Sequence, residues 1–198
     1  MPEREWEVFL RATPVIDWDQ PSVLALADEL SQGAGSQVDT ARACFEWVRD
    51  EIAHTSDHSL DPVTCSASDV LKERTGFCYA KSHLLAALLR ANGIRAGFAY
   101  QRLALEAGGE VFCLHGLNAV WLPEIGWYRL DPRGNRRDLK SARFDPPHEV
   151  LPFTCSATGE RIFPGVFADP ARIVLNALRR FGTRALLEAN LPDATDLA

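Results

Sequence analysis

Three segments in the first half of the chain have apolar residues spaced as on one face of a helix. The first covers residues 21–33 and the second residues 38–52, where charged side chains fall on the opposite face. Either Asp39 or Thr40 is expected to cap the N-terminus of the second helix. A shorter helix is predicted over residues 66–73.

The most apolar helical pattern covers residues 78–92 and ends before Gly93, a residue typical of the position after a helix. Apolar side chains fill nearly every position of this segment, so the helix should be buried on most of its sides. We expect it to be the central helix. Its polar interior positions are Lys81, Ser82, His83 and Arg90.

After Gly93 the pattern changes toward the two-residue period of strands. Three strands are expected, over residues 94–105, 111–122 and 127–131. Their connections are too short for crossovers, so the strands should be antiparallel.

The two ends of the chain carry weaker signals. Residues 6–18 predict an edge strand followed by a turn, and the proline-rich region beyond Asn135 has room for one more short strand. Asp169 as N-cap and Pro170 at the first helical position predict a final helix that ends at Arg180.

Composition and charge exclude several classes of protein. The 198 residues are 46% hydrophobic and 24% charged, which is typical of one globular domain over residues 1–198. The net charge of −6 argues against nucleic acid as a partner. The longest purely apolar run, residues 84–89, is too short to cross a membrane, and the acidic N-terminus lacks the apolar stretch of a signal peptide. We therefore expect a cytoplasmic protein with no membrane partner.

One cysteine stands out by its position. The five cysteines are widely spaced and odd in number, so free thiols are expected. Cys78 follows Gly76 and Phe77 and begins the central helix, where unpaired N–H groups and the helix dipole favour a thiolate. Gly76 would allow a close approach of the backbone. The alternative is that Cys78 is simply a small buried apolar residue.

A nucleophilic thiol needs a base, and the base needs a group that orients it. His115 lies in the second predicted strand and Asp131 at the end of the third. An odd-numbered turn between these strands would place both residues on one face of the sheet, directly opposite for a three-residue turn and diagonal for a five-residue turn. An even-numbered turn would separate them.

The segments GFCYAKSHLLAALLRANGI (76–94) and LHGLNAVWLPEIGWYRLDPRGN (114–135) resemble the cysteine, histidine and aspartate motifs of the transglutaminase-like superfamily. The resemblance covers about residues 38–135. It implies a papain-like α+β fold in which the nucleophile's helix packs on an antiparallel sheet. It also implies that Cys78 is the nucleophile, His115 the general base and acid, and Asp131 the carboxylate that orients the imidazole.

The chain departs from animal transglutaminases in being far shorter, and it has no acidic calcium loop, so calcium activation is not expected and no cofactor is implied. Bacterial members of single-domain form include peptidases and amide hydrolases. The resemblance therefore implies a peptide or amide substrate as acyl donor. Either water or a primary amine could be the acceptor.

Metal binding has little support in the sequence. Cys113 stands two residues before His115, but the chain has no CxxC pair, so a zinc site is not expected. His54 and His58 are separated by residues typical of a loop rather than of an HExxH helix. Asp57 or His58 could line a site, although a surface loop is the simpler interpretation.

Other polar residues compete less well for catalytic roles. His83 lies about 140° around the central helix from Cys78, which favours a core histidine. Asn118 could orient His115, but its even number places it on the opposite face of a regular strand. Trp121 and Trp127 are expected in the core or at its rim rather than as a platform for a ligand. Arg133, Arg136 and Arg137 could line the entrance to the site, although a solvated loop is the simpler interpretation.

The function expected is that of a cysteine-dependent amide or peptide hydrolase or acyltransferase. The backbone N–H of Cys78 would donate to the oxyanion, and a second donor cannot be assigned from the sequence. The competing hypothesis is a non-catalytic binding module that retains the fold. It would not require Cys78, His115 and Asp131 together.

Overall fold

The fold is built on one antiparallel sheet. A computed structural model describes residues 6–106, 109–134 and 142–197. The strands β3 (Ala96–Ala104), β4 (Phe112–Leu122) and β5 (Gly126–Leu130) pair in sequence order, and β8 (Arg161–Ile162) adds to the outer edge of β3. The three predicted strands are thus confirmed, within two residues at each end.

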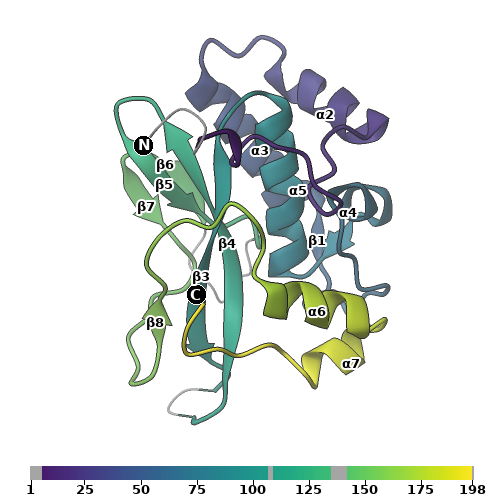
Figure 1. The fold of residues 1–198 in the computed structure, drawn as a ribbon, viewed down its shortest axis with the longest axis vertical. Helices are drawn as coiled ribbons and strands as arrows, with labels where there is room; N and C mark the ends of the chain where they lie inside the picture. Colours follow the sequence, from purple (N-terminus) through teal and green to yellow (C-terminus); the bar gives the residue numbers. More distant parts are fainter. Residues whose placement is uncertain (1–5, 107–108, 135–141, 198) are drawn as a thin grey trace.

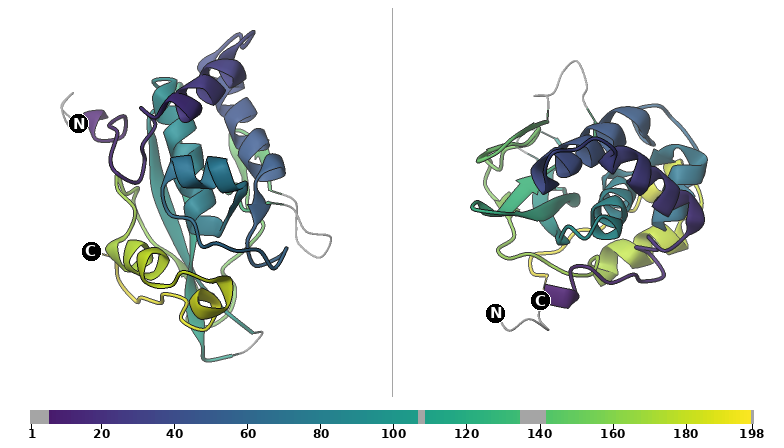
Figure 2. Two further views of the ribbon diagram at one scale, coloured as in Figure 1. Left: turned by 90° about the vertical axis from the view of Figure 1, so that its right-hand side faces the viewer. Right: turned by 90° about the horizontal axis from the view of Figure 1, so that it is seen from above.

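Four helices pack on one side of this sheet (Figure 1). They are α2 (Pro21–Ser31), α3 (Gln37–Glu51), α4 (Ala67–Glu73) and α5 (Cys78–Ala91). The helix α5 contacts the other three helices as well as β3 and β4. Seen from above, it lies in the middle of the molecule (Figure 2). The architecture is α+β, with a central helix on an antiparallel sheet, as the sequence predicts.

Short elements complete the fold. A parallel pair, β1 (Ala53–His54) and β2 (Thr75–Gly76), lies just before α5, and β6 (Arg143–Asp145) pairs with β7 (His148–Val150). The C-terminal helices are α6 (Arg172–Arg180) and α7 (Arg184–Glu188).

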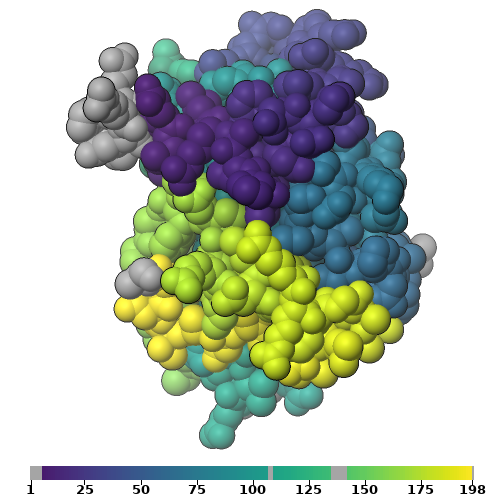
Figure 3. Space-filling model, turned by 45° about the vertical axis from the view of Figure 1, so that its right-hand side comes forward, coloured from purple at the N-terminus to yellow at the C-terminus, as the bar shows by residue number. Residues whose placement is uncertain are grey.

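The C-terminal segment lies against the loop that follows β1. In Figure 3 its yellow residues adjoin the blue residues of that loop on one face of the molecule. The backbone N–H of Arg184 donates to Asp61 at 2.6 Å, and the backbone N–H of Leu114 donates to the carbonyl of Pro192 at 2.7 Å. The chain end therefore joins the β1 loop to β4.

Every residue of α5 from Cys78 to Arg90 is buried. Its polar side chains Tyr79, Lys81, Ser82, His83 and Arg90 each hydrogen-bond to backbone carbonyls, although Nε2 of His83 has no partner. The Arg90 guanidinium donates to the carbonyls of Arg11, Ala96 and Ala168, which come from three different parts of the chain. The predicted burial of this helix on most of its sides is confirmed. No helix among the described residues has the length and apolar character that a membrane crossing requires.

Three predictions are wrong: the strand over residues 6–18, the cap of the second helix and the start of the final helix. Residues 6–18 form a helical turn at Trp6 and irregular chain rather than a strand, because their apolar side chains are buried without a neighbouring strand to pair with. Ser36, not Asp39 or Thr40, caps α3, and its Oγ accepts the backbone N–H of Asp39.

The final helix also begins later than predicted. Its first residue is Arg172, and its N-cap is Ala171 instead of Asp169. The Asp169 side chain pairs with Arg11, so it is engaged in a contact with the N-terminal segment. The short helix α7 that follows has no counterpart in the sequence prediction.

The first turn of α5 approaches β4 closely at Gly116. A Cβ atom at this position would lie 2.9 Å from Cδ1 of Tyr79 and 3.4 Å from its Cα. Tyr79 is buried, and its hydroxyl donates to the carbonyl of Leu114. The ring therefore has little freedom to move, and only glycine fits at residue 116.

We expect Gly116→Ala to lower the free energy of unfolding by about 1–3 kcal/mol, the usual cost of overpacking a core. Urea unfolding followed by tryptophan fluorescence would measure it. Gly182→Ala is the matched control, since a Cβ at Gly182 would meet nothing within 4 Å. Equal stabilities of the two variants would show that helix and sheet can separate at this contact without cost.

Candidate active site

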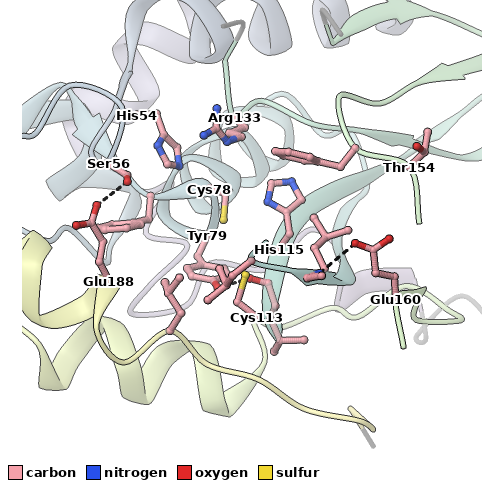
Figure 4. Close-up of a pocket in the computed structure, with 17 residues that line it drawn as sticks. His54, Ser56, Cys78, Tyr79, Cys113, His115, Arg133, Thr154, Glu160 and Glu188 are labelled. Atoms are coloured by element: carbon pink, nitrogen blue, oxygen red, sulfur yellow. Dashed lines mark hydrogen bonds between the residues drawn. The ribbon is translucent and has the colours of Figure 1, made fainter. Parts of the chain in front are cut away.

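Cys78, His115 and Asp131 lie together in one buried group. Cys78 is the first residue of α5, His115 lies in β4, and Asp131 follows β5 directly. His115 Nε2 is 2.7 Å from Asp131 Oδ2. The Cys78 sulfur lies beside the His115 ring (Figure 4), close enough that its negative charge helps to raise the pKa of that ring. Because Asp131 occupies Nε2, the nitrogen that faces Cys78 is Nδ1.

The register of the sheet accounts for the contact between His115 and Asp131. Leu122 pairs with Gly126, which leaves a three-residue turn between β4 and β5. Continued past its last pair, this register brings Asp131 level with Leu117, diagonal to His115. The predicted shared face is present, but the directly opposite arrangement expected for a three-residue turn is wrong. Diagonal neighbours are still within reach of long side chains.

Asn118 points away from this group, as its position in the strand predicts. Its Nδ2 atom donates to the carbonyl of Ser82 at 2.9 Å and to that of Gly97 at 3.3 Å. Asn118 thus fastens the middle of α5 to the sheet. Neither of these two hydrogen bonds is to His115.

The charges around His115 favour its protonated form. Burial lowers the pKa of the imidazole, but the negative charges of Asp131 and of the Cys78 thiolate outweigh burial and raise the pKa to about 10. A histidine with this pKa is an imidazolium at neutral pH. The geometry therefore suits a thiolate–imidazolium pair, with Asp131 as its second negative partner.

Arg133 holds Asp131 from the other side. Its backbone N–H donates to Asp131 Oδ1 at 2.9 Å. Its guanidinium binds both oxygens of Asp57, at 2.8 and 2.9 Å. Both Asp131 oxygens are therefore engaged, and Asp57 is tied to the same group. Arg133 is buried and lines the site, which was the less favoured of the two interpretations of its position, whereas Arg136 and Arg137 lie outside the described residues.

A cavity of about 490 Å³ opens above Cys78. Segments from across the chain form its walls. The residues that line it are His54, Ser56, Phe77, Cys78, Tyr79, Leu103, Ala104, Leu105, Cys113, Leu114, His115, Arg133, Phe153, Thr154, Glu160, Glu188 and Leu191.

The walls carry an aromatic cover and two carboxylates. The Phe153 ring lies 4.9 Å from the His115 ring, edge to face, which shields the imidazole. On one wall Ser56 donates to Glu188 at 2.5 Å. On the opposite wall Glu160 accepts the backbone N–H of Ala104 at 3.0 Å (Figure 4). Each of these two walls therefore carries a carboxylate, and that of Glu188 is paired with Arg184.

Sequence reasoning missed two side chains of this cavity, those of His54 and Phe153. His54 was expected in a loop but belongs to β1, and it is only 8% exposed. A strand of two residues is too short to show periodicity, so no pattern could have revealed it. Phe153 comes from an irregular segment and is equally invisible to pattern reasoning.

The residues considered for a metal site do not form one. In the described parts of the chain, no three His, Cys, Asp or Glu side chains are grouped so that they could hold a metal ion. Cys113 lines the cavity, but burial raises the pKa of its thiol to about 12, which disfavours the thiolate that a metal needs. His58 is exposed in the loop after β1.

His83 is a core histidine, as predicted. It is completely buried, and its Nδ1 lies 2.7 Å from the carbonyl oxygen of Cys65. Burial lowers the pKa of its ring to about 4, so the ring is neutral at physiological pH. Trp121 and Trp127 pack against Trp6 and line no part of the cavity.

The order and spacing of these residues match a known family. The transglutaminase-like superfamily matches residues 24–132, which is more than half of the chain. The chain belongs to the transglutaminase-like superfamily. The matched residues include Cys78, His115 and Asp131. No curated protein matches the sequence.

Solved structures from this superfamily and its neighbours share the fold. A candidate cysteine protease from Cytophaga hutchinsonii is 20% identical, with a TM-score of 0.53 over 82% of this chain and 52% of its own. The periplasmic domain of TgpA from Pseudomonas aeruginosa bound to ethylmercury is 26% identical, with a TM-score of 0.50 over 67% of this chain and 49% of its own. The chain thus spans about half the length of these structures.

We expect Cys78 to be the cysteine that iodoacetamide alkylates fastest near neutral pH. His115 stays protonated below its pKa of about 10, so its positive charge lies beside the sulfur at neutral pH. Burial raises the pKa of the Cys44 and Cys113 thiols to about 12 and also raises that of Cys65. Those three should react only at higher pH. Mass-spectrometric mapping of alkylation against pH measures the profile.

His115→Ala should move the alkylation profile of Cys78 to higher pH, toward that of an ordinary thiol near 8.5. The other four cysteines are internal controls. If Cys78 reacts no faster than Cys65 at pH 6 in either protein, the ion pair does not exist.

Proposed function

We propose that this protein is a cysteine-dependent hydrolase of amide or peptide bonds that works through a thioester. One observation carries the proposal: Cys78 lies beside His115, His115 hydrogen-bonds to Asp131, and Cys78 and His115 both line one cavity. Membership of the transglutaminase-like superfamily supports the same chemistry. The substrate proposed is a peptide or amide, which acts as the acyl donor.

In the first half of the reaction the Cys78 thiolate attacks the carbonyl carbon. The sulfur–carbon bond forms, and the carbonyl oxygen takes the negative charge, which the backbone N–H of Cys78 stabilises. The carbon–nitrogen bond then breaks, and the proton on His115 Nδ1 passes to the leaving amine. The products are a thioester on Cys78, a free amine and a neutral imidazole.

In the second half the thioester is resolved. His115 Nδ1 removes a proton from water, and the resulting hydroxide oxygen bonds to the thioester carbon. Collapse of this intermediate expels the thiolate of Cys78 and releases the acid. Asp131 holds Nε2–H throughout, so that Nδ1 always faces the thiol. A primary amine in place of water would give acyl transfer by the same steps.

We expect Asp131→Asn to lower turnover of an amide substrate by up to about 10⁴-fold while the fold is retained. An asparagine can present its N–H to Nε2, which favours the wrong tautomer of His115. The measurement is hydrolysis of a peptide and amide library, with circular dichroism to verify the fold.

Asn118→Ala is the control for this variant. It removes two hydrogen bonds between α5 and the sheet, so it should lower stability by about 1–3 kcal/mol yet leave turnover per folded molecule largely unchanged. A larger loss of turnover in Asn118→Ala than in Asp131→Asn would make Asn118 the orienting group. Turnover of no amide, ester or isopeptide by the wild type would favour the non-catalytic binding module.

Hydrolysis should dominate over transfer. The thioester would face a single cavity that both the acyl donor and the second reactant must use. A second cavity of about 310 Å³ lies next to the first, but Cys78 does not line it. Product analysis with and without a competing primary amine tests this. More amine-coupled product than free acid at modest amine concentration would identify an acyltransferase instead.

A further inference from the structure

Two rows of side chains cross the sheet next to the nucleophile. In the first row His115 pairs with Gln101 on β3, and Gln101 pairs with Ile162 on β8, so the three side chains rise from one face. The segment around Phe153 covers this row, because Gln101 Nε2 donates to the carbonyl of Phe153 at 3.1 Å and the Phe153 ring packs on His115. Beyond His115, the first row therefore lines a separate cavity of about 440 Å³.

The second row lies two residues further along the strands and is open. Cys113 pairs with Leu103, and the register between β3 and β8, continued by one residue, brings Glu160 level with Leu103. All three residues line the cavity above Cys78. This cavity therefore contains a strip that starts beside the nucleophile, passes over the buried side chain of Leu103 and ends at a carboxylate.

Glu160 holds its carboxylate in a fixed position. Its Oε1 accepts the backbone N–H of Ala104 at 3.0 Å, and its Oε2 accepts those of Ser156 and Ala157 at 2.9 and 3.0 Å. These three hydrogen bonds lower the pKa of the side chain below its ordinary value. Glu160 is therefore ionised at neutral pH and presents its negative charge in one place.

No lysine or arginine in the described part of the chain forms an ion pair with Glu160. Arg102, on β3, points to the opposite face of the sheet, where Asp193 holds it with two hydrogen bonds of 2.7 Å. On the other wall of the cavity Glu188 is already paired with Arg184. Glu160, rather than Glu188, therefore offers an uncompensated charge to a substrate.

The strip leads to the side of the leaving amine. His115 protonates this amine in the proposed reaction, so the amine lies on the His115 side of Cys78. In Figure 4 His115 and Glu160 lie on one side of Cys78, and Ser56 and Glu188 lie on the other. The Glu160 carboxylate therefore faces the half of the substrate that leaves as the amine.

The length of the strip suits one long side chain. Strands lie about 4.8 Å apart and rise about 3.4 Å per residue, so the Cα atoms of His115 and Glu160 are about 12 Å apart. Both side chains rise from the same face, and a hydrogen bond of about 3 Å at each end leaves roughly 6 Å for the substrate to bridge. A chain of about five carbon atoms, as between the two nitrogens of lysine, spans this gap. Its methylene groups would pack on Leu103.

We propose that Glu160 is a specificity-determining residue that selects a lysine as the residue contributing the leaving amine. This inference rests on the proposed function. The scissile nitrogen would lie at His115, the lysine stem along Leu103 and the ammonium group at Glu160. The preferred acyl donor is then a peptide that is cleaved on the N-terminal side of a lysine.

Two amines that differ in one charge test this preference. Lysinamide and norleucinamide have similar stems, and each can enter the leaving-amine site in the reverse direction. Their α-nitrogen attacks the acetyl-thioester that p-nitrophenyl acetate forms on Cys78, the thiolate leaves, and His115 takes the proton of the amine. At about pH 8 a large share of each α-amine is neutral, whereas the lysine side chain stays charged.

The two amides compete in one reaction. Liquid chromatography with mass spectrometry measures the ratio of their Nα-acetylated products, after subtraction of the background from Cys78→Ala. We expect the wild type to favour lysinamide by about fivefold or more, the effect of one ion pair. Glu160→Gln should lower the ratio to about one, and Glu160→Lys should invert it, because like charges repel.

The ratio separates selection from a structural role. If Glu160 only held the backbone of residues 156–160, its loss would reduce both products alike and leave their ratio unchanged. Glu124→Gln removes the same charge in the exposed turn between β4 and β5, so it is the matched control and should retain the wild-type ratio.

A second readout applies if water resolves the thioester before either amine does. An amide that occupies the cavity shields Cys78 from iodoacetamide, and this measurement needs no acylation. Lysinamide should protect the wild type at an about fivefold lower concentration than norleucinamide does. In Glu160→Gln the two amides should protect at equal concentrations.

The outcomes distinguish the inference from the proposed function. If the wild type forms no acetyl-thioester on Cys78, the proposed function fails, and the inference fails with it. If the thioester forms but neither readout shows a preference for lysinamide, only the inference fails. A preference that survives in Glu160→Gln, or that is lost in Glu188→Gln instead, would place the ammonium group elsewhere and also overturns the inference.

Discussion

The close approach of α5 to β4 is the contact on which the site depends. Gly116 lies under the ring of Tyr79, and Ser82 donates to the carbonyl of Gly116 at 3.4 Å. Cys78 immediately precedes Tyr79, and His115 immediately precedes Gly116. The contact between helix and sheet therefore also sets the separation of thiol and imidazole. A larger side chain at residue 116 would push the Cys78 sulfur and the His115 ring apart.

Burial of charge is the second constraint, and the fold meets it by placing groups of opposite charge next to one another. Asp131 accepts from His115 and from the backbone of Arg133, and Lys81 adds a further positive charge near it. Burial lowers the pKa of Lys81 to about 7, against the attraction of Asp131, and its ammonium group donates to the carbonyls of Arg49 and Ile52. We expect substitutions in this cluster of buried charges to be strongly destabilising, because removing one partner leaves a buried charge without compensation.

Much of the fold could be predicted because its main elements are long and bounded by clear turn signals. Nearly every position of the central helix is apolar, and the extended segments of β3 and β4 are buried almost continuously along their length. Parity along β4 and β5 was enough to place His115 and Asp131 on one face and Asn118 on the other. The exact register was not predictable, since it depends on which residues form the turn. The prediction of a strand in the N-terminal segment was wrong because the apolar residues of that segment are buried in irregular chain.

The sequence by itself predicted Cys78, His115 and Asp131 as candidates for nucleophile, base and orienting carboxylate, because helix ends, strand parity and motif order are local properties of the chain. Only the tertiary structure decided which side chains surround them. His54, Asp57, Phe153 and Glu188 come from short or irregular segments far apart in sequence. No periodicity marks them, and their contacts with the site exist only because the chain returns past the start of α5 along several separate paths.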